Sequence, residues 1–221
     1  MLIMGQSNGN FMIKDILFVF GGESTAVEIR ETVDRYCSYR KVYNILPDDK
    51  SKNDKSLNDR DILSFSELEY VCYIMGFTNV NLKKRIRERM SLLGIPEVNI
   101  IHPTAFLSKS SSIGNGNYIA QNVVISSNVK IGNSNIININ ASIGHDSVIG
   151  TDNTINPGVK ISGNVTVGDR NLIGANTVLF QGISICNDCL IDALTYLQIN
   201  IDTPSMISGT SNLRCYKRRF I

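Results

Sequence analysis

The sequence predicts an α/β domain followed by a parallel β-helix, and two periodicities predict the second half. Every sixth residue from Ile101 to Leu197 is isoleucine, leucine or valine, without a change of register. A period of six fits neither a helix nor plain strand alternation, and it is typical of the hexapeptide repeats of a parallel β-helix. A second period, of eighteen residues, runs through Gly114, Gly132, Gly150 and Gly168. Three hexads therefore form one triangular coil, and equivalent residues stack in successive coils.

The first and fifth hexad positions are expected to face the inside of the coils. The fifth holds small or amidic residues, namely Val123, Val129, Ala141, Ser147, Val159, Val165 and Thr177. Asparagines recur every eighteen residues at Asn117, Asn135, Asn153 and Asn171. Stacked amides can hydrogen-bond along the axis, which satisfies groups that are costly to bury alone. At a strand spacing of about 4.8 Å, between five and six coils form a prism roughly 25 Å tall.

The segment ahead of this repeat predicts alternating strands and helices. Ile16–Phe20 is a continuous apolar run, as expected for a buried parallel strand. A tight turn, Gly21-Gly22-Glu23-Ser24, leads to a capping box at Thr25–Glu28 that should open a helix. Lys41–Leu46 is expected to be the second strand.

A charged polar loop over Asp48–Asp61 should separate the second strand from a third strand at Tyr70–Met75, which is closed by Gly76. An amphipathic helix over Leu82–Leu93, basic on its outer face, should then end at Gly94. This order predicts a half-Rossmann domain over residues 15–100. We expect a mobile extension at 1–14, the β-helix at 101–200 and a tail at 201–221.

The glycine turn of this domain is a candidate ligand site. The helix N-terminus after Gly21-Gly22 can hold a phosphate. The Asp48-Asp49 pair can accept hydrogen bonds from a base or a ribose. A full G-x-G-x-x-G is absent, so a plain sharp turn and a solvated acidic turn remain alternative interpretations.

Composition excludes several classes of protein. A net charge of +2 argues against a dedicated nucleic-acid binder, and no apolar run approaches the ~20 residues of a membrane span. The N-terminal residues lack the apolar core of a signal peptide. The five cysteines are scattered, and Cys186 and Cys189 occupy repeat positions without a second pair. We therefore expect neither a disulfide framework nor a metal site, and a cytoplasmic protein.

The chain has two histidines, and we expect different roles for them. His102 precedes Pro103 where the β-helix begins and is interpreted as a structural junction residue. His145 occupies the third hexad position, which does not point inward, and Asp146 follows it. A neutral imidazole there can accept a proton from an attacking amine or hydroxyl, and the carboxylate can orient the ring. Gly163 lies eighteen residues later, and its N–H can face a developing oxyanion. A surface histidine in a turn is the simpler alternative.

The Gly-His-Asp-Ser at 144–147, the Asn-Pro-Gly at 156–158 and the repeat over Leu172–Ile185 resemble the left-handed β-helix acyltransferases. The two-domain order is similar to that of the nucleotide-sugar N-acetyltransferases of the sialic acid O-acetyltransferase-like family. The resemblance implies transfer of an acetyl group from acetyl-CoA to the amino group, at C4, of a nucleotide-linked amino-deoxy sugar. The product would serve bacterial surface glycans such as the lipopolysaccharide O-antigen.

The same resemblance implies a homotrimer without a metal, in which acetyl-CoA lies between subunits. His145 would be the general base and Asp146 its partner. Residues implied to bind acetyl-CoA are Gly163, Thr154, Ala175 and Lys217. Residues implied to bind the nucleotide sugar are Gly21, Gly22, Glu23, Ser24, Asp48, Asp49 and Gly76. Relatives often have a second histidine where this chain has Thr154. A sugar O-acetyltransferase and a non-catalytic hexapeptide-repeat binding protein are the alternative functions.

Overall fold

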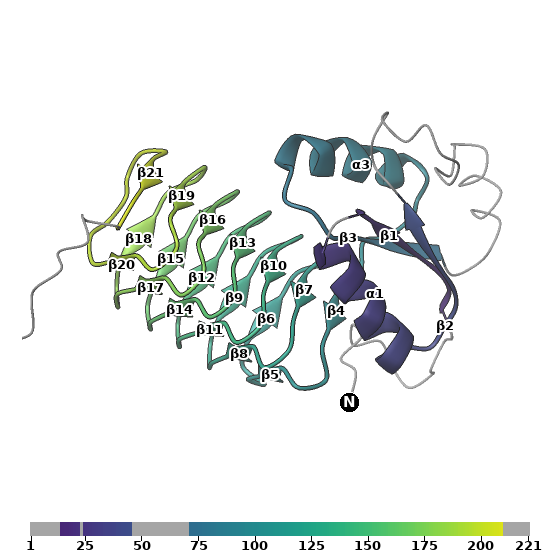
Figure 1. The fold of residues 1–221 in the computed structure, drawn as a ribbon, viewed down its shortest axis with the longest axis horizontal. Helices are drawn as coiled ribbons and strands as arrows, with labels where there is room; N and C mark the ends of the chain where they lie inside the picture. Colours follow the sequence, from purple (N-terminus) through teal and green to yellow (C-terminus); the bar gives the residue numbers. More distant parts are fainter. Residues whose placement is uncertain (1–13, 23, 46–70, 210–221) are drawn as a thin grey trace, which may run out of the picture.

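The computed structural model describes residues 14–22, 24–45 and 71–209, which form a small α/β domain at one end of a triangular β-helix (Figure 1). The predictions for Glu23, Asp48, Asp49 and Lys217 concern residues outside these ranges. The same holds for the predicted loop at 48–61 and for the N-terminal extension, apart from Lys14. Neither helix of the described part has the length and apolarity to cross a membrane.

The α/β domain is a three-stranded parallel sheet between two helices. Its strand order is β2-β1-β3, and the elements are β1 (Lys14–Phe20), α1 (Ser24–Tyr36), β2 (Tyr39–Ile45), β3 (Val71–Met75) and α3 (Val80–Leu92). Leu17, Val19 and Ile74 share a buried cluster with Ala26 and Ile29 of α1. The alternate side chains of β1 and β3 share a second cluster with Ile86 and Met90 of α3. Both sheet faces are covered, which explains the continuous apolar run at Ile16–Phe20.

The helix boundaries differ slightly from those predicted. Helix α1 begins at Ser24, so Thr25 lies inside the first turn instead of capping it. Helix α3 begins two residues earlier than expected, because the Asn79 side chain accepts a hydrogen bond from the Leu82 N–H at 3.0 Å. Gly94 follows the helix with φ +68°, and the Ile95 N–H returns to the Met90 carbonyl, as predicted for a glycine stop.

Eighteen two-residue strands build the β-helix, in three parallel sheets that form its faces. The seven-stranded face contains β4 (Ile100–Ile101), β7 (Tyr118–Ile119), β10 (Ile136–Ile137), β13 (Thr154–Ile155), β16 (Leu172–Ile173), β19 (Leu190–Ile191) and β21 (Met206–Ile207). The six-stranded face contains β5 (Phe106–Leu107), β8 (Val124–Ile125), β11 (Ser142–Ile143), β14 (Lys160–Ile161), β17 (Val178–Leu179) and β20 (Tyr196–Leu197). The five-stranded face contains β6 (Ser112–Ile113), β9 (Lys130–Ile131), β12 (Val148–Ile149), β15 (Thr166–Val167) and β18 (Ser184–Ile185).

The predicted stacking is confirmed in detail. Strands pair eighteen residues apart, for example Ile137 with Ile155, except that β21 pairs with β19 at a distance of sixteen, and the fifth hexad positions from Asn117 to Thr195 are buried. The Asn135 amide donates to the Asn117 side-chain oxygen at 3.0 Å, and each Asn oxygen also accepts the backbone N–H of the next rung. The last rung is the Cys189 N–H, which donates to Asn171. These bonds satisfy the side-chain oxygens of all four asparagines and the side-chain nitrogens of Asn117 and Asn135, whereas those of Asn153 and Asn171 have no hydrogen-bond partner among the described residues.

Each corner of the prism needs one residue in the left-handed region of the backbone. That residue recurs every six positions and is mostly asparagine, aspartate or glycine, the types that tolerate a positive φ best. The non-glycine cases are Asn122, Asn128, Ser134, Asn140, Asp146, Asp152, Asn164, Arg170, Asn176, Asp188 and Leu194. The sequence analysis did not identify this position, although its six-residue recurrence is visible in the sequence.

The α/β domain packs on the first coils of the seven-stranded face. The outward side chains of β4, β7, β10 and β13 are buried, whereas those of β19 and β21 are exposed. His102 is buried at the junction, and its ring packs edge-on against Tyr36 of α1 with the centroids 5.0 Å apart. This placement agrees with the predicted structural role of His102.

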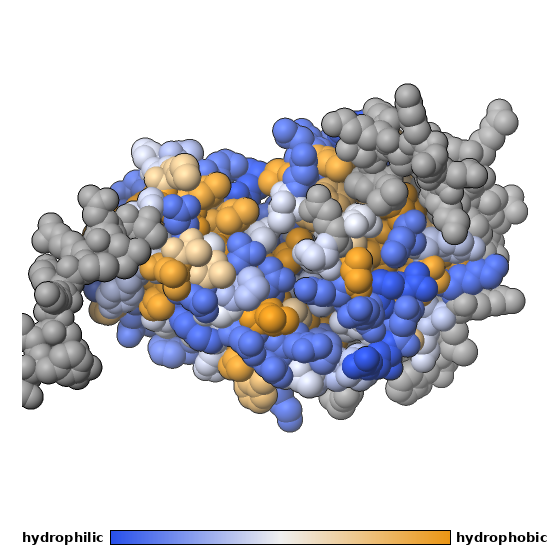
Figure 2. Space-filling view, in the orientation of Figure 1, coloured by the Kyte–Doolittle hydropathy of each residue, from blue (hydrophilic) through white to orange (hydrophobic). Residues whose placement is uncertain are grey.

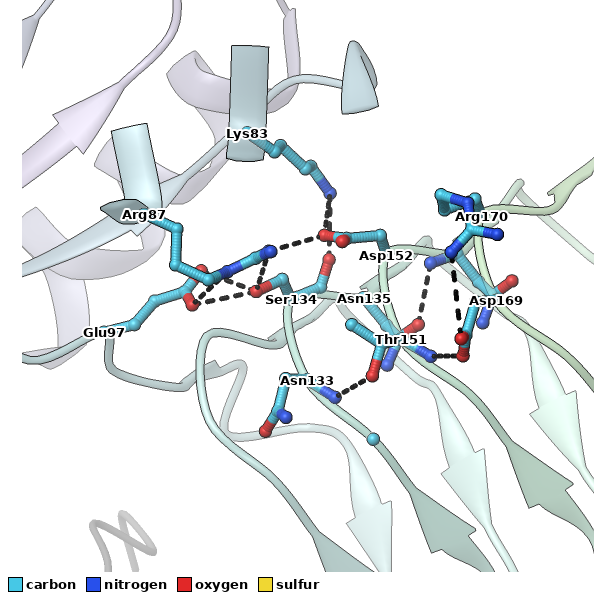
Figure 3. A network of polar contacts seen from close by, with 12 residues as sticks. Lys83, Arg87, Glu97, Asn133, Ser134, Asn135, Thr151, Asp152, Asp169 and Arg170 are labelled. Atoms are coloured by element: carbon cyan, nitrogen blue, oxygen red, sulfur yellow. Dashed lines mark hydrogen bonds and ion pairs between the residues drawn. The ribbon is translucent and has the colours of Figure 1, made fainter. Parts of the chain in front are cut away.

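A charged network joins α3 to one corner of the β-helix (Figure 3). The Lys83 ammonium donates to the Ser134 carbonyl at 2.8 Å and lies 3.8 Å from Asp152. Arg87 donates to Asp152 at 2.7 Å and to the Ser134 hydroxyl at 2.9 Å, and that hydroxyl donates to Glu97. The network attaches the domain to the prism through Lys83 and Arg87, which the sequence predicts only as basic residues on the outer face of the helix.

The buried Lys83 should give the stability of the protein a distinctive pH dependence. Burial lowers the pKa of Lys83 from 10.5 to about 8, although Asp152 and Glu97 oppose this shift. Between pH 8 and 10.5 the unfolded chain therefore binds more protons at this residue, so the free energy of unfolding should rise with pH in that window. This contribution is lost as the pH falls through 8. We expect a gain of up to about 3 kcal/mol.

Urea unfolding between pH 7.5 and 10 checks this expectation. Lys83→Met should lose the gain. Lys84→Met should keep it, because Lys84 is the next residue of α3 and its side chain is 75% exposed. An unchanged pH dependence in Lys83→Met would contradict the assignment.

Candidate active site

His145 lies on the corner of the prism between β11 and β12, where the six- and five-stranded faces meet. Its side chain is 51% exposed, in agreement with a hexad position that points away from the core. The corner is held by backbone bonds, since the Asn164 N–H donates to the His145 carbonyl and the Asp146 N–H to the Ser127 carbonyl. The ring is therefore attached to a rigid backbone and remains open to solvent and substrate.

The Asp146 carboxylate is hydrogen-bonded to the His145 ring. It occupies the left-handed corner position, with φ +59°, and its Oδ2 lies 2.8 Å from His145 Nδ1. The His145 ring and then the Asn128 amide hold the pKa of Asp146 below its ordinary value. An ionised carboxylate can only accept, so it favours the tautomer with the proton on Nδ1. That tautomer leaves Nε2 free to accept a proton.

Gly163 lies directly against His145 Nε2. A Cβ atom placed on Gly163 would be 2.6 Å from Nε2, and one placed on Gly144 would be 2.6 Å from the Gly163 nitrogen. Both positions thus need glycine for the ring and the next coil to approach this closely. Among the hydrogen bonds of the described residues, none uses the Gly163 N–H. The corner therefore combines a proton acceptor with a free backbone donor.

Asn128 is a residue of this site that the sequence analysis missed. Its side-chain amide donates to Asp146 Oδ1 at 3.0 Å, opposite the oxygen that meets His145. The signal in the sequence is its position eighteen residues before Asp146, on the same corner of the preceding coil.

Thr154 and Ala175, which were also expected to contact acetyl-CoA, do not join this corner within one chain. Thr154 lies in β13 on the seven-stranded face, the side opposite the His145 corner, and is buried. Ala175 lies on the corner between β16 and β17, where the seven- and six-stranded faces meet. Only Gly163 of that set lies beside His145 in the described chain.

Four of the residues expected to bind the nucleotide sugar meet at the carboxyl edge of the small sheet. Gly21 follows β1 and Gly76 follows β3, and the Gly76 N–H donates to the Phe20 carbonyl at 2.8 Å. Gly21 has φ +134°, and a Cβ there would be 2.9 Å from Ala26 Cβ. Gly22 and Ser24 are exposed beside them, at the N-terminus of α1. At this edge Gly22 and the N-terminus of α1 are exposed, whereas Gly21 and Gly76 are buried and let α1 pack closely on the sheet.

Two other features of the described residues belong to the scaffold. A hollow of about 460 Å³ between α3 and the β-helix is lined by Arg87 and Glu97 but not by His145, and these two side chains bond to Asp152 and Ser134 of the charged network. The Cys186 and Cys189 sulfurs are 3.6 Å apart, and the described residues contain no cluster of three metal-ligating side chains.

Comparison with known proteins supports the fold on both sequence and structure. Residues 147–181 match the bacterial transferase hexapeptide repeat. Comparison with curated protein sequences finds no significant match. The structure is similar to a variant of perosamine N-acetyltransferase from Caulobacter crescentus in complex with CoA and GDP-perosamine. The TM-score is 0.77 at 21% identity, over 91% of this chain and 96% of that one.

Two further solved structures have the same two-part fold. The acetyltransferase domain of PglB from Neisseria gonorrhoeae, in complex with acetyl coenzyme A, has a TM-score of 0.78 at 21% identity, covering 89% of this chain and 97% of that one. WeeI from Acinetobacter baumannii has a TM-score of 0.75 at 19% identity, covering 84% and 92%. The resemblance to the left-handed β-helix sugar N-acetyltransferases is therefore confirmed at the level of the fold.

Proposed function

We propose that this chain transfers an acetyl group from acetyl-CoA to the C4 amino group of a nucleotide-linked amino-deoxy sugar, for the synthesis of bacterial surface glycans. The observation that carries the proposal is the His145 corner, where Asp146 holds one ring nitrogen and the other lies against Gly163. This arrangement occurs on a fold shared with sugar N-acetyltransferases solved with CoA, acetyl coenzyme A or GDP-perosamine.

The proposed chemistry uses the two ring nitrogens of His145, because Nδ1 is bonded to Asp146 and Nε2 can accept a proton. The sugar amine attacks the thioester carbonyl while His145 Nε2 accepts its proton, and Asp146 stabilises the resulting imidazolium. The C–N bond forms, and the oxyanion is held by the free Gly163 N–H. The intermediate collapses with cleavage of the C–S bond, and the imidazolium returns the proton to the CoA thiolate. Both substrates react directly, so no acyl-enzyme is needed.

The nucleotide sugar is assigned to the carboxyl edge of the small sheet. Gly22 is exposed there, Gly21 and Gly76 let α1 approach the sheet edge closely, and the N-terminus of α1 offers N–H donors to a diphosphate. Glu23, Ser24, Asp48 and Asp49 complete this proposed set. For acetyl-CoA we propose Gly163, Ala175 and Lys217, whereas Thr154, which is buried, does not belong to this set.

We further propose a homotrimer, because two of the proposed acetyl-CoA residues, Gly163 and Ala175, lie on different corners of the prism. Neighbouring prisms would bring the face of one subunit to the His145 corner of another. Apolar side chains are available for such contacts on the six-stranded face, where Phe106, Val124 and Tyr196 are exposed. Figure 2 shows apolar surface near the C-terminal coils, between polar side chains. Light scattering should give three times the mass of one chain, and a monomer that turns over substrate would contradict the shared site.

Thiol release from acetyl-CoA tests the reaction. We expect turnover with one of the UDP-, dTDP- or GDP-linked 4-amino-6-deoxy sugars, with a mass gain of one acetyl group on the amine. The matched 4-hydroxy sugars are the control, because an O-acetyltransferase would prefer them. A protein that neither binds acetyl-CoA nor releases thiol would be a non-catalytic repeat protein, and the proposal would fail.

A further inference from the structure

Both carboxylate oxygens of Asp146 have a partner, and the two partners come from different coils. Oδ2 lies 2.8 Å from His145 Nδ1, and Oδ1 accepts from the Asn128 amide at 3.0 Å. Asp146 is 45% exposed, so packing alone does not hold its rotamer. The amide of the preceding coil therefore limits the rotation of the carboxylate.

Asn128 is itself held by the coil that precedes it. It has φ +59°, and its backbone N–H donates to the Ser110 hydroxyl of the preceding coil at 3.0 Å. Because the acceptor on its other side is a carboxylate, the amide must present its nitrogen to Asp146. Ser110, Asn128, Asp146 and His145 thus form one hydrogen-bonded line that ends at the imidazole.

The same stacking occurs without a charged group at the neighbouring corner. Asn122 has φ +56° and donates to the Asn140 side-chain oxygen at 3.4 Å, across the same eighteen-residue step. The bond to Asp146 is shorter and has a charged acceptor, and such bonds are stronger than neutral ones. A corner asparagine ordinarily supplies the positive φ and stacks on the next coil, as Asn122 does. The feature particular to Asn128 is that its amide donates to a carboxylate, that of Asp146.

We propose that Asn128 is a positioning residue, whose amide holds Asp146 so that its second oxygen fixes the His145 ring with Nε2 unprotonated toward Gly163. The catalytic significance of this arrangement rests on the acyl transfer proposed above. The position and the tautomer of the His145 ring can be tested without turnover. The lowered pKa of Asp146, to which the His145 ring contributes most and the Asn128 amide second, agrees with this role.

The first test is the tautomer of His145, measured by nitrogen-15 NMR of the two imidazole rings at a pH where they are neutral. The wild-type ring should carry its proton on Nδ1. Asn128→Gly, which tolerates the positive φ, should shift His145 toward a mixture of tautomers, and Asn122→Gly should not. His102, the chain's other histidine, is buried at the domain junction and provides an internal reference. An unchanged His145 tautomer in Asn128→Gly would overturn the proposal.

The second test is kinetic. Asn128→Gly should lower kcat about tenfold with little change in KM, the scale of a lost hydrogen bond to a charged group. Asn122→Gly should leave both constants unchanged. A purely structural role would instead lower the thermal midpoint of both variants equally and leave the tautomer unaltered, which would overturn the proposal. A tautomer shift in a protein that acetylates no acceptor would support the positioning role and refute the proposed function.

Discussion

Replacing His145 by alanine should lower kcat by about 10²- to 10⁴-fold, which is the range of general base catalysis. The free Gly163 N–H and the binding surfaces remain in this variant, so a residual rate above the uncatalysed reaction is expected. The fold should be unaffected, because the His145 side chain is half exposed and its one described hydrogen bond is to Asp146. Thiol release with the accepted sugar gives the rate, and thermal unfolding checks the fold.

Lys109→Ala is the matched control for His145→Ala. Lys109 occupies the same corner two coils earlier and is exposed. Its removal should leave kcat within about twofold of the original value, as for a surface change away from the reacting atoms. Equal losses in the two variants, or full activity in His145→Ala, would refute the role of His145 as the base.

Replacing Gly163 by alanine should abolish most of the activity while sparing the fold. The added methyl would lie 2.6 Å from His145 Nε2, but the ring is the far end of a half-exposed side chain and can swing outward. We expect a loss of about 100-fold in kcat, because both the position of the base and the approach to the N–H are disturbed. The free energy of unfolding should change by less than about 1 kcal/mol.

Gly132→Ala should show the opposite pattern. A Cβ at Gly132 would lie 2.7 Å from the Gly150 carbonyl oxygen, and backbone inside a stacked coil cannot move aside. Overpacking of this kind costs about 1 to 3 kcal/mol. Urea unfolding and thiol release on both variants give the comparison. If Gly163→Ala loses stability as Gly132→Ala does and keeps its kcat, Gly163 is only a spacer between coils.

The candidate site was predictable where its residues are neighbours in sequence or separated by one coil. His145 and Asp146 are adjacent, and Gly163 follows at the eighteen-residue repeat, so their meeting depends only on the period. Asn128 precedes Asp146 by the same eighteen residues. It was not predicted, because asparagine recurs at the corners of the prism as a backbone residue and the period alone does not distinguish the one that meets Asp146.

The sequence by itself determined the β-helix, because each coil is specified locally. The same pattern recurs in each coil: an aliphatic residue every six positions, an asparagine every eighteen and a residue tolerant of positive φ at each corner. Each coil of the prism packs mainly on its neighbours, so this local pattern is sufficient to specify the repeat. Strands β1 and β3 of the small domain were likewise visible as apolar runs.

Only the tertiary structure decided how the two parts are joined and which faces remain open. Lys83 and Arg87 looked like solvated residues on a basic helix, but they reach Asp152 and Ser134 across the junction. Thr154 matches the period as an outward residue, and it is buried because the small domain covers that face. Such contacts depend on long-range docking between surfaces with no common period, so no local pattern in the chain encodes them.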